Sequence, residues 1–244
     1  MSAIAQLVPA LGGELTGVAE LQRILGLIVP ALGETVAMVA IVMVIVLLLG
    51  TPLGLLVFNL SEAGLFPNRA LHTLLSWVIS IGRSLPFLVL MAAIIPFTRF
   101  VVGTSIGIAA AVVPMSIAGM AFFARIVENA VRTVPVIHVR VARASGASPL
   151  QIIRSVQLHE AIPILWGGLT INSIAMVDYS AIAGTIGAGG LGYVAVVYGY
   201  QRFDQNVMLA TVITLVLLVG AIQVIGDRVV KKTTPQQAEQ LAQV

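Results

Sequence analysis

The chain contains no cysteine, which excludes disulfide bonds, thiolate metal sites and thiol catalysis. It also has little lysine. The two lysines are Lys231 and Lys232, near the carboxyl end, so the phosphate-binding motif G-x-x-x-x-G-K-[ST] does not occur. The chain therefore has no phosphate loop with which to hydrolyse ATP, and any dependence on ATP would come from a separate subunit.

Charge is scarce as well. Charged residues make up 9% of the 244 residues, against about 25% in an average soluble domain. Hydrophobic residues make up 59%, and the mean hydropathy is +1.05. The basic residues gather at the ends of apolar runs and form no continuous stripe, so the pI of about 9.7 does not indicate nucleic-acid binding. The sequence predicts an all-α integral membrane protein.

The first 26 residues differ from the rest. They contain Glu14 and Glu20 and lack a basic start followed by an apolar core, so we expect no cleavable signal peptide. Ten uncharged residues separate Arg23 from Glu34, too few for a bilayer that needs about 20. We therefore expect an amino-terminal extension over residues 1–26 that is interfacial or loosely ordered.

Residues 27–232 form the predicted transmembrane domain, and a polar tail follows over residues 233–244. Five spans are expected at about 35–58, 70–98, 104–124, 161–182 and 205–226, with one long loop over residues 125–160. Pro52 should kink the first span. Arg83 and Pro86 should bend the second, so both are candidates for a structural role.

The distribution of basic residues predicts the orientation. Nine fall on one side of the five spans: Arg69, Arg125, Arg132, Arg140, Arg143, Arg154, Arg228, Lys231 and Lys232. The other side holds Arg23, Arg99 and Arg202. By the positive-inside rule, the long loop and the carboxyl terminus are cytoplasmic and the amino terminus is outside.

Within the long loop, residues 142–155 show helix–turn–helix punctuation. Gly146 is suited to end a helix in the left-handed conformation. Ser148 can cap a second helix, and Pro149 fits the first turn of that helix. We expect two short helices outside the bilayer, forming a surface for a partner.

Several segments also carry a resemblance to a known family. Gly146, the nine residues after it and Val156-Gln157-Leu158 resemble the cytoplasmic EAA loop of ATP-binding-cassette import permeases. RSLPF (83–87), IPFTR (95–99), VGTSIG (102–107), ARIVENA (124–130), YSA (179–181) and GAGGLG (187–192) resemble methionine import permeases, and the similarity covers about residues 27–232. Arg140 stands where the family has Glu, and His159 where it has Pro.

The resemblance implies a homodimer in the bacterial inner membrane. Two ATPase subunits would bind ATP and Mg below it, and a periplasmic or lipid-anchored substrate-binding protein would dock above. It implies that the ATPase contacts lie at Arg140, Ala142, Arg143, Ala144, Ser145, Gly146, Ala147, Ser148, Pro149, Leu150 and Ile153. Asp178, Tyr179, Ser180 and Ile182 match or adjoin the segment that lines the translocation pathway in the family, with Ile182 at the position of a gating methionine.

Two patterns could suggest other chemistry. The glycine spacing at 187–192 fits a dinucleotide-binding loop, but that loop works between a strand and a helix, and here it follows a membrane span. His72, His138 and His159 lack partners at ligand spacing, so no metal site is expected. No set of nucleophile, base and orienting residue is recognisable, so we expect no enzymatic activity in this chain alone.

Two other classes of function fit the sequence less well. A stand-alone secondary transporter or channel usually shows internal repeats and intramembrane acids, whereas this chain has an odd number of spans and Asp178 as one such acid. A structural membrane anchor would need neither broken helices nor the glycine-rich segment. For the importer, D- or L-methionine, a methionine derivative or another small amino acid all fit as substrate.

Overall fold

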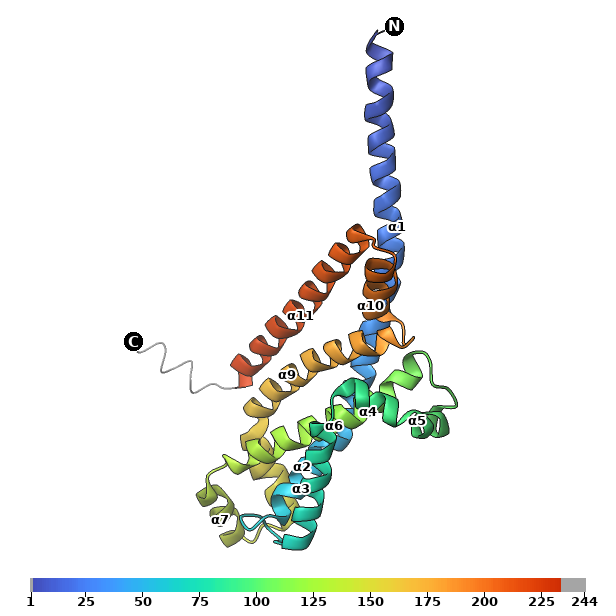
Figure 1. The fold of residues 1–244 in the computed structure, drawn as a ribbon. Helices are drawn as coiled ribbons and strands as arrows, with labels where there is room; N and C mark the ends of the chain where they lie inside the picture. Colours follow the sequence, from blue (N-terminus) through green and yellow to red (C-terminus); the bar gives the residue numbers. More distant parts are fainter. Residues whose placement is uncertain (1, 234–244) are drawn as a thin grey trace, which may run out of the picture.

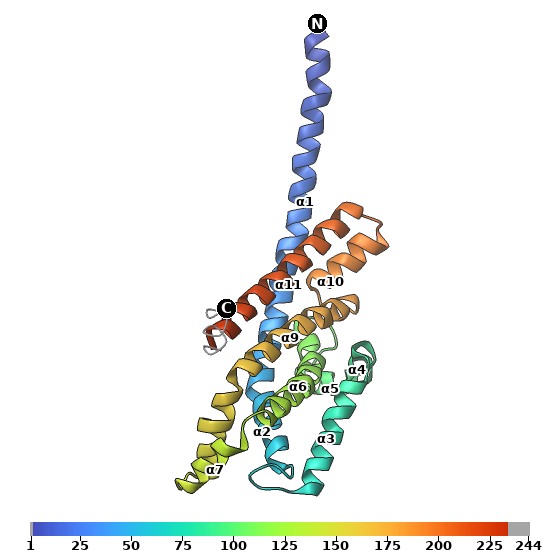
Figure 2. The same cartoon turned by 90° about the vertical axis from the view of Figure 1, so that its left-hand side faces the viewer.

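The computed structural model describes residues 2–233, with side chains from residue 17 onward, and every regular element in this range is a helix. In order they are α1 (Ser2–Ile45), η1 (Val46–Gly50), α2 (Thr51–Leu60), α3 (Arg69–Ser84), α4 (Phe87–Ala93), α5 (Ile95–Val102), α6 (Ile108–Arg132), α7 (Val136–Ala144), α8 (Pro149–Ile152), η2 (Ile153–Gln157), α9 (Leu158–Thr185), α10 (Gly190–Tyr193), η3 (Val194–Gln201) and α11 (Gln205–Thr233). The three η elements are π-helical. Figures 1 and 2 show how the helices are arranged.

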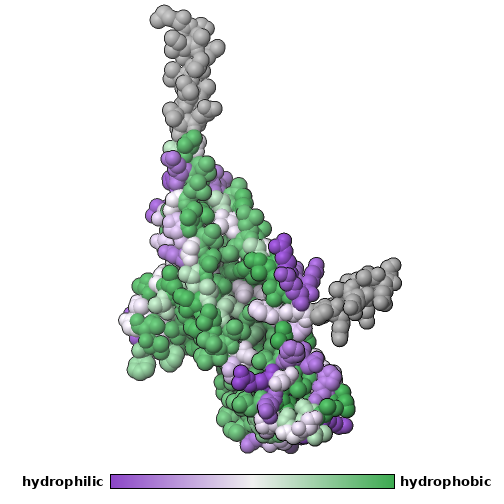
Figure 3. Space-filling model, turned by 180° about the vertical axis from the view of Figure 1, so that it is seen from behind, coloured by the Kyte–Doolittle hydropathy of each residue, from purple (hydrophilic) through white to green (hydrophobic). Residues whose placement is uncertain are grey.

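Four helical stretches in the described part of the chain are long and apolar enough to cross a membrane, and a bent pair of helices raises the number to five. The four are Gly17–Leu60, Ile108–Arg132, Pro149–Thr185 and Gln205–Thr233, and the bent pair is α3 with α4. From behind, hydrophobic residues cover most of the middle of the body, and hydrophilic residues gather at the lower end (Figure 3). The all-α membrane fold class is confirmed.

The first span is longer than expected. The sequence predicts a span over residues 35–58 after a separate extension, but α1 is continuous from Ser2 to Ile45. The chain then passes through η1 and α2 to Leu60 without a break. Pro52 lies inside this continuous stretch and has no N–H to donate to the preceding turn, and the π-helical turn η1 directly precedes it.

The second span is broken. In place of one bent helix over residues 70–98, α3 and α4 meet at 107° across Leu85 and Pro86, and α5 follows. Pro86 explains the break because it has no backbone N–H and disfavours a helical conformation in Leu85. Accordingly, Leu85 is extended, with ψ of 131°.

Two other boundaries also differ. The long loop was expected to begin at residue 125, but α6 continues to Arg132 and carries Arg125 and Glu128 on its last turns. At the other end of the loop, α8, η2 and α9 form one continuous helical stretch, Pro149–Thr185. The irregular part of the loop is therefore limited to a few residues on either side of α7.

The core lies where α1, α6 and α9 cross, around buried side chains such as Met38, Met115 and Met176. Small residues allow the helices to approach closely, as is common between membrane helices. A Cβ on Gly54 of α2 would clash with the backbone of Ala124 in α6.

At the lower end, a buried pair of amide side chains joins α2 to η2. Asn59 Nδ2 donates to Gln157 Oε1 at 2.8 Å, and Gln157 Nε2 donates back to Asn59 Oδ1 at 3.0 Å. Asn59 Nδ2 also donates to the Leu55 carbonyl at 2.9 Å. Asn59 is 0% exposed and Gln157 2% exposed, so no water replaces these bonds. The pair fixes the position of η2, and with it α7 and α8, against the first span.

This pair gives a prediction about stability. Asn59→Leu leaves the Gln157 amide buried without a partner, which costs about 1–3 kcal/mol. We expect a lower melting temperature in detergent, and partial recovery in the double variant Asn59→Leu/Gln157→Leu, because it removes both polar groups. Gln223→Leu, at an exposed amide on α11, is the control and should melt as the wild type does. An Asn59→Leu protein as stable as the control would contradict this account.

Candidate functional site

The segment that was predicted to form a helix–turn–helix does form two helices, α7 and α8, joined by a turn. At the end of α7, Gly146 has φ of +80°, Gly146 N donates to the Arg143 carbonyl at 3.0 Å, and Ala147 N donates to the Ala142 carbonyl at 3.0 Å. These two bonds and the left-handed glycine form a Schellman motif. No atom lies within 4 Å of a Cβ built on Gly146, so the positive φ alone requires glycine here. The prediction for Gly146 is confirmed.

The start of α8 is capped from both directions. Ser148 Oγ accepts from Gln151 N at 3.4 Å, and Gln151 Oε1 accepts from Ser148 N at 2.8 Å, which is a capping box. Pro149 occupies the first turn, as expected. The turn between α7 and α8 is therefore held by its own hydrogen bonds.

We call residues 136–157 the coupling segment. Nothing in the described chain covers most of it, and α7 has no buried residue. Four large apolar side chains are more than half exposed: Val136 (61%), Ile137 (59%), Val141 (57%) and Leu150 (64%). The remaining predicted ATPase contacts are exposed, apart from the half-buried Ala142, Ala147 and Ile153. An exposed surface that mixes apolar and basic groups is typical of a protein-binding site.

Three contacts anchor the coupling segment to the spans. Ile152 is 1% exposed. Gln157 makes the amide pair described above, and His138 Nδ1 of α7 lies 3.2 Å from Glu160 Oε1 in the first turn of α9. His159, the second departure from the family pattern, is exposed in that same turn.

A buried carboxylate that the sequence analysis missed lies at the lower end of α6. Glu128 is 1% exposed; its Oε2 lies 2.6 Å from Arg125 Nη1 and its Oε1 lies 2.9 Å from Arg132 Nη2. His72 Nε2 of α3 lies 4.0 Å from the carboxylate. The spacing R-x-x-E-x-x-x-R places Arg125, Glu128 and Arg132 on one face of α6. This spacing is the sequence pattern from which the ion cluster could have been predicted. The cluster joins α6 to α3 at the end of the bundle that carries the coupling segment.

The predicted pathway residues point in different directions from α9. Asp178 is exposed. Tyr179 is half-buried and stacks on Phe87 of α4, with ring centroids 4.3 Å apart and an angle of 3° between the rings. Ser180 is 1% exposed and donates to the Val177 carbonyl at 2.7 Å, while Ile182 packs against the core. Of these four residues, only Asp178 presents an ionisable group at the surface of the chain.

Arg83 and Asp178 are oppositely charged side chains within the predicted spans, but they form no ion pair among the described residues. The Arg83 guanidinium lies 5.8 Å from the centre of the Phe122 ring in α6, and its side chain is exposed. Asp178 instead lines a groove of 490 Å³ between α9 and α11, together with Gln223. Its carboxylate therefore has no cation beside it within the described chain.

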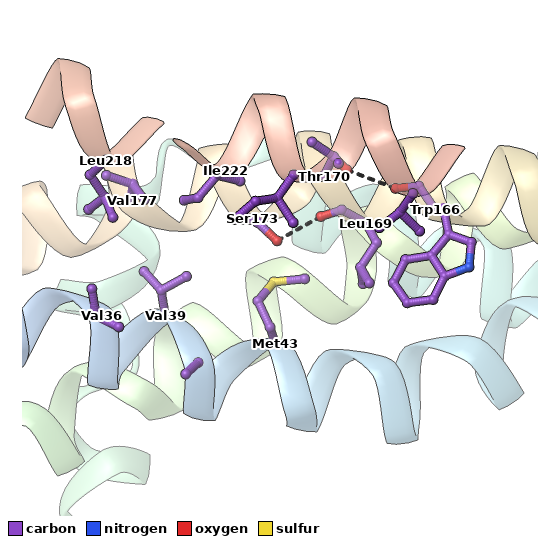
Figure 4. A pocket seen from close by; sticks show the side chains of 14 residues that line it. Val36, Val39, Met43, Trp166, Leu169, Thr170, Ser173, Val177, Leu218 and Ile222 are labelled. Carbon is purple, nitrogen blue, oxygen red and sulfur yellow. Dashed lines mark hydrogen bonds between the residues drawn. The ribbon is translucent and has the colours of Figure 1, made fainter. Parts of the chain in front are cut away.

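A second groove, of 330 Å³, lies between α1, α9 and α11 (Figure 4). Its polar side chains include Thr170 and Ser173, whose hydroxyls donate to the carbonyls of Trp166 and Leu169 on their own helix. Apolar side chains form nearly all of its remaining surface, among them Val39 and Met43. This groove is unsuited to a zwitterionic solute, because it offers no charged partner.

The glycine-rich segment at 187–192 packs on α1. Gly190 N donates to Glu34 Oε2 at 2.6 Å, and Leu191 N donates to Thr35 Oγ1 at 2.9 Å. The backbone N–H of Gly190 is thus bonded to a carboxylate of the chain itself, and α1 packs where a ligand would approach this segment. In the described part of the chain no group of three or more potential metal ligands occurs either.

Comparison with known proteins extends these observations. Residues 61–235 match the family described as "Binding-protein-dependent transport system inner membrane component". A probable D-methionine transport system permease protein MetI of Vibrio cholerae is 47% identical over 206 residues, which are 84% of this chain and 92% of that protein. The methionine import system permease protein MetP of Bacillus subtilis is 39% identical over 70% of this chain and 78% of its own length.

Among solved structures, an inward-facing conformation of the MetNI methionine ABC transporter contains a chain that superposes with a TM-score of 0.85. That chain is 40% identical, and the match covers 87% of this chain and 98% of that one. The family match covers well over half of the sequence, and the fold agrees with that of a solved relative. The chain therefore belongs to the family of inner membrane components of binding-protein-dependent transport systems.

Proposed function

We propose that this chain is the permease of an ATP-driven methionine importer and that it works as a homodimer with two ATPase subunits. The observation that carries the proposal is the coupling segment, which is preformed by its own hydrogen bonds yet exposes apolar and basic side chains. The names of the relatives support methionine as the substrate. A stand-alone transporter, a channel or a membrane anchor would not need such a segment.

In this proposal the coupling segment docks into the ATPase, and movement of the ATPase passes to the spans by rigid contact. Two features support this route. The turn between α7 and α8 is stiff because a Schellman motif and a capping box hold it. From α8 the chain continues without a break into α9, and the buried Gln157 joins it to Asn59. A displacement of the coupling segment would therefore reach α9 and α2 together.

Glutamate is usual in the family at the position of Arg140. The ATPase surface that contacts Arg140 would therefore differ from the surface that contacts this glutamate in other members. Arg140 and Arg143 are both exposed on α7. A charge reversal at one position favours a cognate ATPase that is acidic or neutral there.

A substrate-binding protein would dock at the opposite end of the spans. Helix α5 and the loops before α6 and α11 expose large apolar side chains there, with Phe100 of α5 at 87%, Ile106 at 66% and Phe203 at 85% exposed. Phe203 also has φ of +56°, a conformation that bulky side chains rarely adopt. Exposed apolar groups beside a membrane surface support protein docking at these loops.

Asp178 would lie in the translocation pathway. Its exposed carboxylate faces the groove between α9 and α11, and an ionisable group in a span usually marks a pathway or a partner. A carboxylate there attracts the ammonium group of a zwitterionic amino acid. Tyr179, Ser180 and Ile182 would then support the pathway through packing, since Ser180 is buried and Tyr179 stacks on Phe87.

The function is tested by ATP-driven methionine uptake into proteoliposomes that contain this chain and its ATPase. We expect Gly146→Val to assemble but to lose at least nine-tenths of uptake, because valine at positive φ strains the turn by about 1–3 kcal/mol. Gly103→Val is the matched control, since Gly103 also has positive φ and open space around it but lies in the opposite loop. Normal uptake by Gly146→Val, or equal loss in both variants, would refute the coupling role.

The orientation is tested with single cysteines in this naturally cysteine-free chain. A membrane-impermeant maleimide should label Ser148→Cys only after the cells are permeabilised, because the basic loop is expected in the cytoplasm. The same reagent should label Gln201→Cys in intact cells. The reverse labelling pattern would invert the proposed orientation.

For Asp178, we expect Asp178→Asn to reduce methionine uptake at least fivefold while leaving the melting temperature in detergent unchanged. The reason is that the carboxylate has no partner within the described chain, so its removal breaks no ion pair. Asp227→Asn serves as the control at an exposed carboxylate on α11. A large loss of stability in Asp178→Asn would make the residue structural and end the pathway role.

A further inference from the structure

The apolar groove between α1, α9 and α11 has no part in the proposed transport function (Figure 4). Its floor is made of buried side chains, since Val39 of α1 is 8% exposed and Val177 of α9 is 2% exposed. Other lining residues are open: Val36 is 45% exposed, Trp166 40% and Ile225 61%. The groove is therefore a concavity in the side of the bundle that can be entered from the membrane.

Helix α11 closes one side of this groove through a close contact with α9. A Cβ on Gly226 would clash with the side chain of Thr170, so glycine allows the two helices to touch there. The hydroxyls of Thr170 and Ser173 bond to carbonyls of their own helix. The walls therefore ask for no polar partner, and a hydrocarbon chain can fill the space without leaving a polar group unsatisfied.

The dimensions of the groove fit a hydrocarbon chain better than a helix. On α11 its lining runs from Leu218 to Val229, which is about 16 Å at 1.5 Å per residue. A volume of 330 Å³ spread over this length gives a cross-section of about 20 Å². A helix about 10–12 Å wide has a cross-section of about 80–110 Å² and cannot enter.

The end of the groove at Trp166 leads to basic residues. Figure 4 shows Trp166 at the end away from Val36 and Leu218. Lys232 follows the lining residue Ile225 by seven residues, which is close to two turns, so it continues the same face of α11 past this end. Tryptophan and lysine at the end of a span are typical of the membrane interface, where lipid headgroups lie.

The charge at this end is positive. Arg228, Lys231 and Lys232 are exposed and have no ion-pair partner among the described residues. Asp227, the acidic residue in this stretch, lies about 160° around α11 from the centre of the groove face. Its carboxylate accepts from Gln223 Nε2 at 2.9 Å. A negatively charged headgroup would therefore meet basic groups and no opposing carboxylate on this face of α11.

We propose that the groove binds one anionic phospholipid. Its acyl chain lies against Val39 and Val177, and its phosphate lies beside Trp166 and Lys232. The lipid fills the space between α11 and the bundle, which matters because Val207 and Thr211 are the residues of α11 that the described chain buries. The proposal goes beyond the transport function and does not depend on which solute is carried.

The two tryptophans of the chain provide the assay. Trp77→Phe leaves Trp166 as the one tryptophan of the permease, and its fluorescence is recorded in the transporter with its ATPase in lipid vesicles. The vesicles contain phosphatidylglycerol or phosphatidylcholine with brominated acyl chains, because bromine quenches the tryptophans that these chains touch. The fluorescence of the same complex carrying Trp77→Phe/Trp166→Phe is subtracted, which removes the signal of the ATPase.

We expect the brominated phosphatidylglycerol to bind beside Trp166 at least fivefold more tightly than the phosphatidylcholine. Fivefold corresponds to about 1 kcal/mol, the attraction of one basic residue at a membrane surface. Lys232→Gln should remove this preference, and Lys232→Arg should keep it. Lys231→Gln is the matched control, since Lys231 carries the same charge but points about 160° away from the centre of the groove face.

A second pair of variants tests the acyl chain. Ala40→Phe fills the groove from α1 and should at least halve the quenching of Trp166, whereas Ile41→Phe, at an exposed position outside the groove, should not. If no brominated lipid quenches Trp166, protein covers the groove. Equal quenching by both lipids, or a preference that survives Lys232→Gln, means that ordinary bulk lipid lies there. Each of these results would overturn the proposal, and none depends on methionine uptake.

Discussion

The hydrocarbon of a bilayer offers no hydrogen bonds, and this constraint explains how the polar groups of the chain are arranged. Some buried polar groups bond to their own helix, as Ser180 does, while others pair with partners far away in the sequence. Asn59 and Gln157 exchange two hydrogen bonds across 98 positions. Gly190 and Leu191 donate to Glu34 and Thr35. The relative positions of the first span, the glycine-rich segment and η2 depend on these few contacts.

The coupling segment, which is expected outside the bilayer, follows a different rule. The turn between its two helices is held by local hydrogen bonds: the Schellman motif at Gly146 and the capping box at Ser148. Its apolar side chains remain open to solvent in the described chain. A preformed but uncovered surface loses little conformational entropy when a partner binds, which suits a contact that must transmit force. The Glu128 cluster lies nearby and joins α6 to α3.

The remaining exposed polar groups lie on helix surfaces that no other part of the described chain covers. Asp178 faces a groove beside α11, and Arg83 and Ser84 are exposed at the end of α3. Both lie on helices expected within the membrane, where lipid is a poor neighbour for them. A second copy of the chain enclosing water between these helices would satisfy both. The apolar groove of Figure 4, by contrast, already satisfies its hydroxyls internally and suits hydrocarbon.

The sequence by itself determined the membrane class, the turn at Gly146 and the capping of α8, because hydropathy and turn chemistry act over a few neighbouring residues. It also located the bend at Pro86, since proline disfavours a helical conformation in the residue before it, here Leu85. Only the tertiary structure decided that Ser180 is buried, that Asp178 is open without Arg83 beside it, and that Glu128 is enclosed by two arginines. Those outcomes depend on which helix faces pack together, and that packing is set by contacts between residues far apart in the chain.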